Sequence, residues 1–312
     1  MVASKNRFLA IVNPAAGGGK CGRLAGPALA RLREKGLSVD VIASTGPGHA
    51  VKLAREAYSQ GYRHFLAVGG DGTAHEILNG IFKNNPGPNS TSSSKNAGRI
   101  SLGFLPLGTG NSFLRDFSND GAEASIEALL ENRRRSVDLI RLTHAAGEIY
   151  SFNILSIGFT ADVGALANRV FKPLGHLGYL FGVIVRVIQL KRRAFTLRSD
   201  GEEEWDNSRA LFLTFNNSKY TGGTMLIAPD ADPSDGFIEF VRWGPIGRFG
   251  LLRMLPKLYD GTHIKHTLAS RKSVKRVEFR IPVPIDVMID GEIFSLECKS
   301  LDILPSALDV YI

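Results

Sequence analysis

Short apolar runs alternate with helical patterns through the first third of the chain. The runs are rich in β-branched residues, and the segments between them repeat apolar residues at helical spacing. This alternation is typical of βαβ units that build a largely parallel sheet. The predicted strands are Phe8–Val12, Ser38–Ala43, His64–Val68 and Ile100–Leu105. The predicted helices are Leu24–Lys35, Ala50–Gln60 and Ala74–Phe82.

After about Asn132 the pattern changes to short alternating runs separated by turn residues, which predicts an antiparallel sandwich or barrel. These runs are Ser136–Leu142, Ile149–Ile154, Ala210–Asn216, Gly236–Arg242, Ser273–Ile281 and Pro284–Ile289. Helical patterns interrupt them at Leu177–Lys191 and Gly247–Tyr259. We therefore expect an α/β domain over residues 1–132 and an all-β sandwich domain over residues 133–300, with residues 301–312 returning to the first domain.

The composition is that of an ordinary folded protein. Of the 312 residues, 44% are hydrophobic and 22% charged, which excludes whole-chain disorder, collagen-like repeats and coiled coil. The formal net charge of +8 favours anionic partners such as nucleotides, nucleic acid or an acidic membrane surface, without choosing among them. Cys21 and Cys298 are too few for a disulfide scaffold and lack metal-ligand spacing, so we expect a reducing compartment.

No segment predicts a secretory signal or a membrane span. The apolar run Phe8–Val12 stops at Asn13, and the longest apolar stretch, Leu177–Leu190, falls below the roughly 20 residues that a spanning helix needs. Residues 176–193 join an apolar run to a basic cluster, which predicts contact with an anionic membrane surface. The alternative for this stretch is a buried core helix with a solvated basic end.

Glycine-rich loops follow three of the predicted strands. They are Asn13–Lys20, Gly69–Thr73 and Pro106–Ser112. Glycines let backbone amides approach an anion closely, and a following helix N-terminus carries partial positive charge, so phosphate binding has a direct physical basis. The first loop also satisfies the dinucleotide pattern G-x-G-x-x-G, which keeps a dehydrogenase open as an alternative, and a plain tight turn is another.

Asp71 stands among the glycines of the second loop. A carboxylate beside phosphate oxygens would be repelled unless a cation lay between them, and Mg²⁺ supplies that cation in phosphoryl transfer. The alternative is that Asp71 only caps the following helix. The third loop adds hydroxyl and amide donors at Thr109 and Asn111.

Taken in order, these motifs resemble the diacylglycerol kinase catalytic-domain family, which includes bacterial soluble lipid kinases and sphingosine kinases. The resemblance covers essentially the whole chain. Its motifs are VNPAAGGGK (12–20), GGDGTAHEILNG (69–80), GFLPLGTGNS (103–112), FNILSIGFTADV (152–163), APDADPSDGFIEF (228–240) and IDGE (289–292). It implies an ATP-binding α/β domain similar to those of NAD kinases and phosphofructokinases, then a β-sandwich domain, with the active site in a cleft between them.

Carried over residue by residue, the resemblance implies a nucleotide site and a magnesium site. The positions implied for nucleotide binding are Asn13, Gly17, Thr45, Gly69, Gly70, Asp71, Gly72, Thr73, Thr109 and Asn111. The implied structural magnesium site uses the Asp235 side chain with backbone oxygens near Asp232 and Phe237. Closely spaced oxygens on a turn suit a hard cation, although an ordinary Asp-Gly turn is the alternative.

The segment Asp290-Gly291-Glu292 resembles the family's DGE motif. The resemblance implies that Glu292 accepts the proton of the lipid hydroxyl, that Asp290 shares this role or holds magnesium, and that Asp71 is a rival base. A simple hairpin turn is the alternative from spacing alone. Many diacylglycerol kinases carry Asp where this chain has Ser112, which weakens an assignment to diacylglycerol in particular.

The expected activity is therefore transfer of the γ-phosphoryl group of ATP to a lipid hydroxyl, diacylglycerol-like or sphingosine-like, with Mg²⁺ as cofactor. The expected partners are the lipid substrate and a peripheral anionic membrane surface but no nucleic acid, and a homodimer stays open. We expect a cytoplasmic location, in part at the inner face of a membrane. The alternatives are an NAD kinase-like enzyme and a non-catalytic lipid-binding protein on a kinase scaffold.

Overall fold

The computed structural model describes residues 7–83, 98–118, 120–166, 187 and 189–312. The chain divides into two compact units, Met1–Leu139 with Pro305–Ile312, and Ile140–Leu304. The first is an α/β unit and the second is built on antiparallel sheets, which confirms the predicted fold class. The predicted helix Leu177–Lys191 lies largely outside the described residues.

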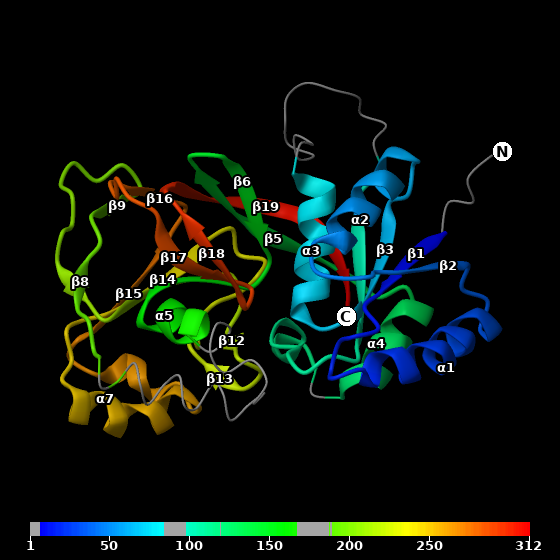
Figure 1. The fold of residues 1–312 in the computed structure, drawn as a ribbon, viewed down its shortest axis with the longest axis horizontal. Helices are drawn as coiled ribbons and strands as arrows, with labels where there is room; N and C mark the ends of the chain where they lie inside the picture. Colours follow the sequence, from blue (N-terminus) through cyan, green and yellow to red (C-terminus); the bar gives the residue numbers. More distant parts are fainter. Residues whose placement is uncertain (1–6, 84–97, 119, 167–186, 188) are drawn as a thin grey trace. The chain divides into compact units, whose positions relative to one another are not determined.

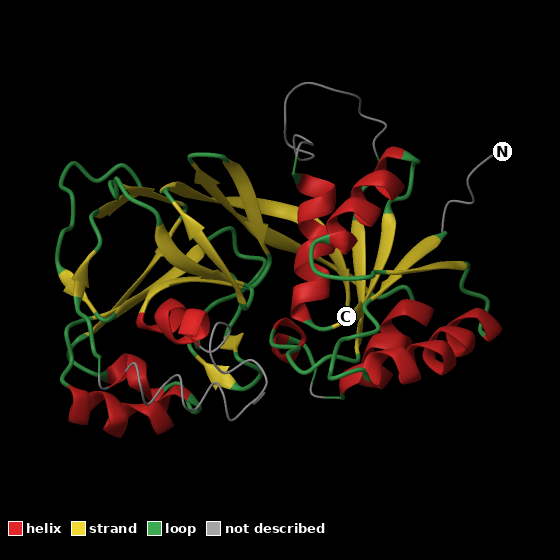
Figure 2. Cartoon of the chain, in the orientation of Figure 1, coloured by secondary structure: helices red, strands yellow, loops and turns green. Residues whose placement is uncertain are grey.

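The first unit is a parallel sheet with helices on both faces (Figures 1 and 2). Its strand order is β2-β1-β3-β4-β19. The strands are β1 (Phe8–Val12), β2 (Val39–Ala43), β3 (His64–Gly69), β4 (Ser101–Pro106) and β19 (Cys298–Tyr311). The helices are α1 (Lys20–Glu34), α2 (His49–Ser59), α3 (Asp71–Phe82) and α4 (Gly121–Leu130), with the short 3₁₀ helix η1 (Phe113–Asp116). The end of β19 pairs in parallel with β4 through Asp309 and Val310.

Helix α2 is fixed against α3 by one small residue and one carboxylate. A Cβ atom on Gly80 would lie 2.4 Å from the carbonyl oxygen of Val51, so only glycine allows the two helices to approach this closely. The Glu76 carboxylate accepts hydrogen bonds from the amides of Gly48 and Ala50 at 2.8 and 3.0 Å. These amides belong to the start of α2, so a side chain of the protein already satisfies that helix terminus.

The second unit is a sandwich of two sheets around a hydrophobic core. One sheet is antiparallel, in the order β15-β14-β11-β7-β17-β18. Its strands are β7 (Ile154–Gly158), β11 (Phe212–Asn216), β14 (Ile238–Trp243), β15 (Ala269–Val274), β17 (Ile285–Ile289) and β18 (Glu292–Leu296). The other layer is the second unit's part of the nine-stranded sheet to which β1–β4 also belong. It is formed by the end of β5 (Arg134–His144), β6 (Gly147–Ser151), β9 (Leu197–Ser199), β16 (Arg276–Phe279) and the first part of β19.

Aromatic side chains join the two sheets of this sandwich. Phe215 on β11 stacks on Phe240 on β14, with ring centroids 4.8 Å apart. Phe279 on β16 meets Phe215 edge to face at 5.7 Å. All three rings are buried, and such pairs add about 0.5–1.5 kcal/mol each beyond the area that they bury.

Short elements complete the second unit, and a second core covers the outer face of the six-stranded sheet. The helices are α5 (Phe159–Leu166), α7 (Arg248–Met254), η4 (Leu255–Leu258) and η5 (Thr262–Lys265). The remaining strands are β8 (Arg193–Ala194), β10 (Arg209–Ala210), β12 (Tyr220–Thr221) and β13 (Met225–Leu226). In this second core Phe212 stacks on Trp243 at 5.7 Å, and Leu251 and Met254 of α7 pack against the same cluster.

Two runs predicted as single strands are each divided in the structure. Ile149–Ile154 breaks at Phe152-Asn153 into β6 and β7, which belong to different sheets. Ser273–Ile281 breaks at Lys275 into β15 and β16, which also belong to different sheets. Within the part of the chain that the structure describes, no helix combines the length and apolar character needed to cross a membrane.

Candidate functional site

The three glycine loops lie at one edge of the parallel sheet, because β1, β3 and β4 run in the same direction. The Asn13 amide donates to the carbonyl oxygen of Val68 at 2.9 Å, which aligns the first loop with the end of β3. The Gly108 amide donates to the carbonyl oxygen of Gly69 at 2.9 Å, which joins the second and third loops. The carboxyl ends of strands in open α/β sheets are the usual location of ligand sites.

The loops contact each other backbone to backbone. A Cβ atom on Gly108 would lie 2.6 Å from the nitrogen and Cα atoms of Gly70, and one on Gly70 would lie 3.0 Å from the carbonyl oxygen of Gly110. Gly17 has φ +62°, and a Cβ atom there would lie 2.9 Å from the carbonyl oxygen of Leu107. Close contact with neighbouring backbone therefore requires glycine in the second and third loops. In the first loop, both such a contact and the positive φ value require it.

Several amides of the second and third loops point to no acceptor of the protein. Among the described residues, no hydrogen bond uses the amide of Gly70, Gly72, Thr109 or Gly110. By contrast, the amides of Lys20, Cys21 and Gly22 at the start of α1 donate to carbonyl groups of their own loop. The second and third loops, with the N-terminus of α3, therefore offer a stronger anion site than the first loop and the start of α1.

Asp71 is the first residue of α3 and is half-buried between these two loops. Its Oδ2 atom accepts a hydrogen bond from the Ser112 amide at 2.8 Å. The N-cap residue of α3 is Gly70, so the interpretation of Asp71 as a plain helix cap is wrong. Since the contact uses the backbone of Ser112, it does not depend on which side chain stands at position 112.

The other residues expected to bind nucleotide are near the same edge of the sheet. Asn13 Nδ2 donates to Thr73 Oγ1 at 3.3 Å, which connects the first loop to α3. Asn111 Nδ2 donates to the carbonyl oxygen of Gly108 at 3.3 Å, which shapes the third loop. Thr45 is exposed in the loop between β2 and α2, and its hydroxyl group lies 3.0 Å from His49 Nδ1.

The DGE segment forms the turn of the β17–β18 hairpin in the second unit. Asp290 and Gly291 have φ values of +48° and +91°, as a two-residue type I′ turn requires. The Asp290 side chain is nevertheless buried, with 4% exposure. Its Oδ1 atom accepts from Ser151 Oγ at 2.6 Å and from two amides at 3.1 Å, and its Oδ2 atom accepts from a third amide at 3.4 Å. The donor amides belong to residues 152–154.

Glu292 differs sharply from Asp290 although only one residue separates them. It is exposed at the start of β18, and no hydrogen bond or ion pair among the described residues involves its carboxylate. The structure therefore separates the two acids of the motif. Asp290 is a buried acceptor with several donors, whereas Glu292 is an exposed carboxylate with none.

The loop expected to hold magnesium carries two carboxylates in tight turns. Asp232 Oδ1 accepts from the Ser234 amide at 3.0 Å, and Asp235 Oδ1 accepts from the Phe237 amide at 2.9 Å. Lys275 Nζ lies 5.0 Å from the centre of the Phe237 ring. Across the described ranges, no three His, Cys, Asp or Glu side chains are grouped to hold a metal. An oxygen-only set with backbone carbonyl groups nonetheless suits Mg²⁺.

Sequence reasoning did not single out Glu239, a buried acid on β14 near this loop. Burial raises the pKa of Glu239, and the nearby charge of Asp235 raises it further, against a hydrogen bond from Ser273 Oγ at 3.1 Å. Arg271 lies 3.9 Å from its carboxylate. The signal in the sequence was a single acid among the largely apolar residues of β14, which also contains Arg242.

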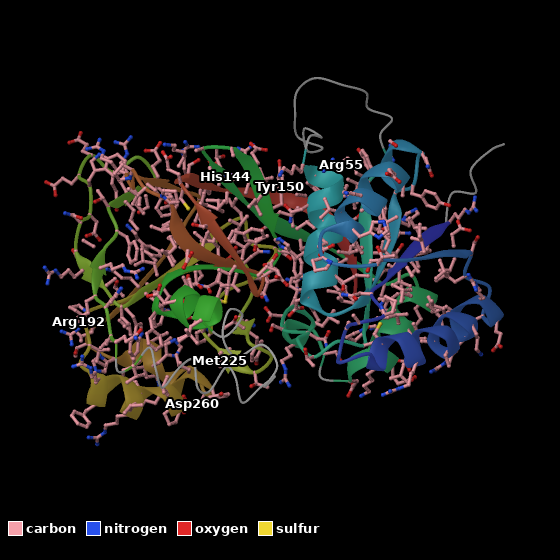
Figure 3. All side chains as sticks on the ribbon, viewed as in Figure 1. Arg55, His144, Tyr150, Arg192, Met225 and Asp260 are labelled. Atoms are coloured by element: carbon pink, nitrogen blue, oxygen red, sulfur yellow. The ribbon has the colours of Figure 1, made fainter. Side chains whose placement is uncertain are left out.

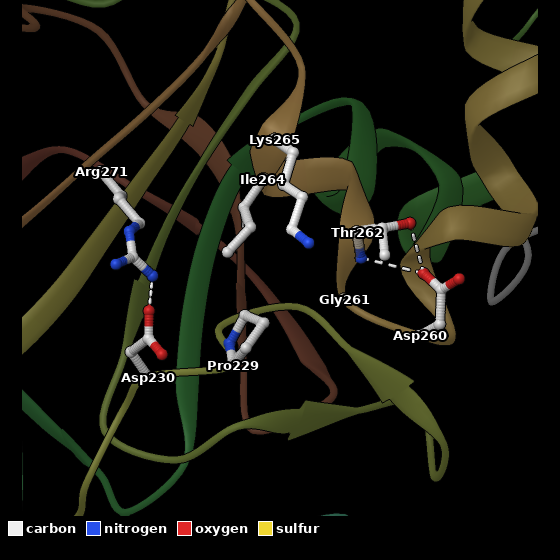
Figure 4. A pocket seen from close by; sticks show the side chains of 8 residues that line it. All are labelled: Pro229, Asp230, Asp260, Gly261, Thr262, Ile264, Lys265 and Arg271. Carbon is white, nitrogen blue, oxygen red and sulfur yellow. Dashed lines mark hydrogen bonds and ion pairs between the residues drawn. The ribbon is translucent and has the colours of Figure 1, made fainter.

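A pocket of about 530 Å³ lies elsewhere in the second unit (Figure 4). Arg271 points toward Asp230 across it and forms an ion pair with that carboxylate. At the other end, Asp260 Oδ1 accepts from the amide and hydroxyl groups of Thr262 at 2.9 and 2.6 Å. None of the residues expected to bind nucleotide or metal lines this pocket.

Two family profiles match consecutive parts of the chain. The diacylglycerol kinase catalytic domain matches residues 7–142, and the YegS C-terminal NAD kinase beta sandwich-like domain matches residues 153–312. The chain therefore belongs to the diacylglycerol kinase catalytic-domain family, in its YegS-like form with a β-sandwich second domain. This confirms the resemblance seen in the motifs.

Individual relatives match over nearly the whole length. A protein named diacylglycerol kinase from Mycobacterium tuberculosis is 28% identical over 307 residues, which are 97% of this chain and 94% of that protein. A protein named "Probable lipid kinase YegS-like" from Pseudomonas putida is 28% identical over 287 residues, 91% of this chain and 89% of that protein. The crystal structure of a diacylglycerol kinase from Bacillus anthracis superposes with a TM-score of 0.67 at 18% identity, covering 99% and 97% of the two chains, which supports the fold.

Proposed function

We propose that this protein is an ATP-dependent lipid kinase that transfers the γ-phosphoryl group of ATP to a hydroxyl group of a diacylglycerol-like or sphingosine-like lipid. The observation that carries the proposal is the pair of glycine loops in backbone contact, which have free amides and hold a carboxylate between them at the start of α3. The names of the relatives, diacylglycerol kinase and lipid kinase, support the same activity.

The chain supplies the nucleotide site largely from its backbone. The amides of Gly70, Gly72, Thr109 and Gly110 would donate hydrogen bonds to phosphate oxygens, and the N-terminus of α3 adds partial positive charge. These donors are held in place before ATP arrives, because the Gly108–Gly69 and Asp71–Ser112 hydrogen bonds fix the two loops. Such preorganised donors stabilise charge that develops during transfer.

Mg²⁺ is the cation that would allow Asp71 to lie beside phosphate oxygens. When bound there, it neutralises negative charge on the phosphates. The Asp71 carboxylate lies between the two loops at the start of α3, so it fits a role as cation ligand. The Asp232, Asp235 and Phe237 loop is the proposed structural magnesium site, because it gathers carboxylate and carbonyl oxygens within two successive turns.

We assign the role of proton acceptor to Glu292. A general base needs a carboxylate that is not already saturated with donors, and Glu292 meets this condition while Asp290 does not. Asp290 is better described as a residue that positions the hairpin turn. Asp71 stays the rival base, and a homodimer stays a prediction from the resemblance.

The test is transfer of labelled phosphate from ATP to a panel of acceptors, namely diacylglycerol, monoacylglycerol, sphingosine, ceramide, phosphatidylglycerol and NAD. We expect a phosphorylated lipid that depends on Mg²⁺. A labelled product from NAD alone would identify an NAD kinase instead. If no acceptor is labelled, the proposal is wrong, and the alternative of a lipid-binding protein on a kinase scaffold is favoured.

A further inference from the structure

Helix α7 and the residues after it expose large apolar side chains on the second unit. Phe249 is 89% exposed, Leu252 is 48% exposed and Tyr259 is 60% exposed. Phe249 and Leu252 are three residues apart on the helix, so they share one face. Together with Arg253 and Lys257, these residues form a surface that we call the α7 patch.

The core of the unit fixes the orientation of this face. Leu251 and Met254 lie on the opposite side of α7 and are buried in the same cluster as Trp243. A Cβ atom on Gly250 would lie 2.8 Å from Ile246 Cγ1, so glycine at this position allows close packing of the helix on its own lead-in segment. The exposure of Phe249 and Leu252 is thus a consequence of how α7 is anchored, since rotation of the helix would expose Leu251 and Met254 instead.

The charges along the chain around the patch are mostly positive. Between Glu239 and Asp260 the sequence contains four basic residues and no acidic one. Arg253 and Lys257 are exposed, and no hydrogen bond or ion pair among the described residues involves either side chain. Asp260, the acid that follows Tyr259 in the chain, directs one carboxylate oxygen to Thr262 (Figure 4).

We infer that the α7 patch docks the protein on an anionic lipid bilayer. An aromatic and an aliphatic side chain on one helix face, with cations beside them, match the apolar interior and the negative surface of such a membrane. A symmetric contact between two copies would place Arg253 and Lys257 of each copy near those of the other, and like charges disfavour that arrangement. The inference rests on the proposed function, since the acceptor lipid of a lipid kinase lies in a bilayer.

Vesicle sedimentation in the absence of ATP tests this docking separately from catalysis. Vesicles of phosphatidylcholine with about a third of phosphatidylglycerol should bind the wild-type protein, and vesicles of phosphatidylcholine alone should bind it much more weakly. Each cation near an anionic surface contributes about fivefold in affinity, so Arg253→Gln with Lys257→Gln should weaken binding about 25-fold. Phe249→Ser with Leu252→Ser should weaken binding to both kinds of vesicle.

Two matched controls use exposed residues of the same chemistry elsewhere. Lys52→Gln with Arg55→Gln removes two exposed cations from α2 (Arg55 is labelled in Figure 3), and Val283→Ser removes an apolar side chain that is 57% exposed. Both controls should bind vesicles as the wild type does. If they weaken binding as much as the α7 variants do, or if the α7 variants bind like the wild type, the inference is wrong.

Insertion of the patch can be measured directly, because Cys21 and Cys298 are both buried. Phe249→Cys therefore provides a single accessible thiol for a polarity-sensitive dye, and Val283→Cys provides the control. The dye at position 249 should shift to the blue when anionic vesicles are added, while the dye at position 283 should not. No shift at position 249, or a shift that grows with protein concentration in the absence of vesicles, would overturn the inference and the latter would indicate a contact between copies.

The vesicle-binding measurements and the phosphoryl-transfer assay test separate claims, so a negative result in one does not imply a negative result in the other. Vesicle binding that is lost in the α7 variants supports the docking surface even if no lipid is phosphorylated. Phosphorylation of a lipid with no vesicle binding through α7 supports the proposed function and contradicts the docking surface.

Discussion

The Asp71 carboxylate accepts a hydrogen bond from the backbone amide of Ser112 at 2.8 Å. This bond ties the loop after β3 to the loop after β4, at the edge where the free amides of both loops gather. One carboxylate oxygen, Oδ2, thereby holds the two loops together, and the proposed function adds a role for the carboxylate as cation ligand. Substitutions can separate the observed structural role of Asp71 from its proposed electrostatic role.

Asp71→Ala and Asp71→Asn should differ in stability but not in activity. Alanine removes both the hydrogen-bond acceptor and the charge, whereas asparagine keeps an acceptor for the Ser112 amide and loses only the charge. We expect both variants to lose at least about 100-fold in kcat, by analogy with the loss of other preorganised electrostatic groups. Urea unfolding should show Asp71→Asn close to the wild type. Wild-type kinase activity in purified Asp71→Ala would rule out the assignment.

Glu292→Gln should reduce turnover without affecting folding. Loss of a general base costs about 10²- to 10⁴-fold in rate, and the exposed Glu292 side chain makes no contact whose loss would destabilise the fold. We expect kcat to fall by that factor while KM for ATP and the melting temperature stay unchanged. Glu203→Gln, at another exposed acid of the same unit, is the matched control and should retain full activity.

Asp290→Ala should have a large effect on stability. The substitution leaves Ser151 and the amides of residues 152–154 without their buried acceptor, and each such loss costs about 1–3 kcal/mol. It also places alanine at φ +48°. We expect the free energy of unfolding to fall by about 3 kcal/mol or more. Asp290→Asn, which keeps one acceptor oxygen and tolerates this φ, should lose less, and equal losses would argue against the hydrogen-bond explanation.

Gly108→Ala should destabilise the protein, whereas Gly26→Ala should change its stability much less. A methyl group at position 108 would meet the Gly70 backbone at 2.6 Å, so the loops must separate, at a cost of about 1–3 kcal/mol. At Gly26, inside α1, a methyl group meets no atom within 4 Å outside its own helix and chain neighbours, but Pro27 follows, and the proline ring disfavours helical backbone at a preceding residue that carries a Cβ atom, so the usual gain from alanine should be largely offset. Denaturant unfolding measures both effects. Gly108→Ala should also raise KM for ATP, and an unchanged KM would place the nucleotide elsewhere.

His263 should make the stability of the protein sensitive to mild acid. It is fully buried, and burial lowers its pKa despite contacts with the carbonyl groups of Lys257 and Ile227 at 3.3 and 3.1 Å. Below the unfolded pKa of about 6.5, the unfolded chain binds a proton that the folded chain resists. The free energy of unfolding should therefore fall as the pH drops from about 7 to about 5. His263→Gln should show a shallower decrease over this range, and parallel curves would contradict the prediction.

The local pattern of apolar and polar residues was sufficient to predict most helices and strands of the first unit. The strand Phe8–Val12 has the bounds predicted from the sequence, and α2 and α3 differ from their predicted ranges only at the ends. The strand is a short buried run, and each of the two helices begins after a glycine, so local chemistry largely determines these elements. Helix α4 was not predicted, because Gly121–Leu130 follows a turn-rich segment and lacks a strong polar face.

Contacts between residues far apart in the sequence explain the structural features that the local sequence pattern did not predict. The chain passes from one sheet to the other at Lys275, which separates β15 from β16. The break occurs there because the Asp200 carboxylate accepts hydrogen bonds from the backbone amides of Lys275 and Arg276, at 2.8 and 2.9 Å. Likewise, the burial of Asp290 depends on donors at residues 151–154, far away in the sequence. The glycine loops were visible in the sequence, whereas the different environments of the two acids in the DGE segment were not.

Strand β19 contributes to both units, so the sheet of the first unit cannot be completed during synthesis until β19 has been translated. Its residues from Pro305 onward belong to the first unit, where Tyr311 is buried in the core and Arg99 binds Asp309 with two hydrogen bonds, at 2.9 and 2.6 Å. Until a ribosome has made these residues, β4 has no neighbour on that side. The unit that is translated first thus remains an unfinished sheet with an exposed edge until translation of the second is complete.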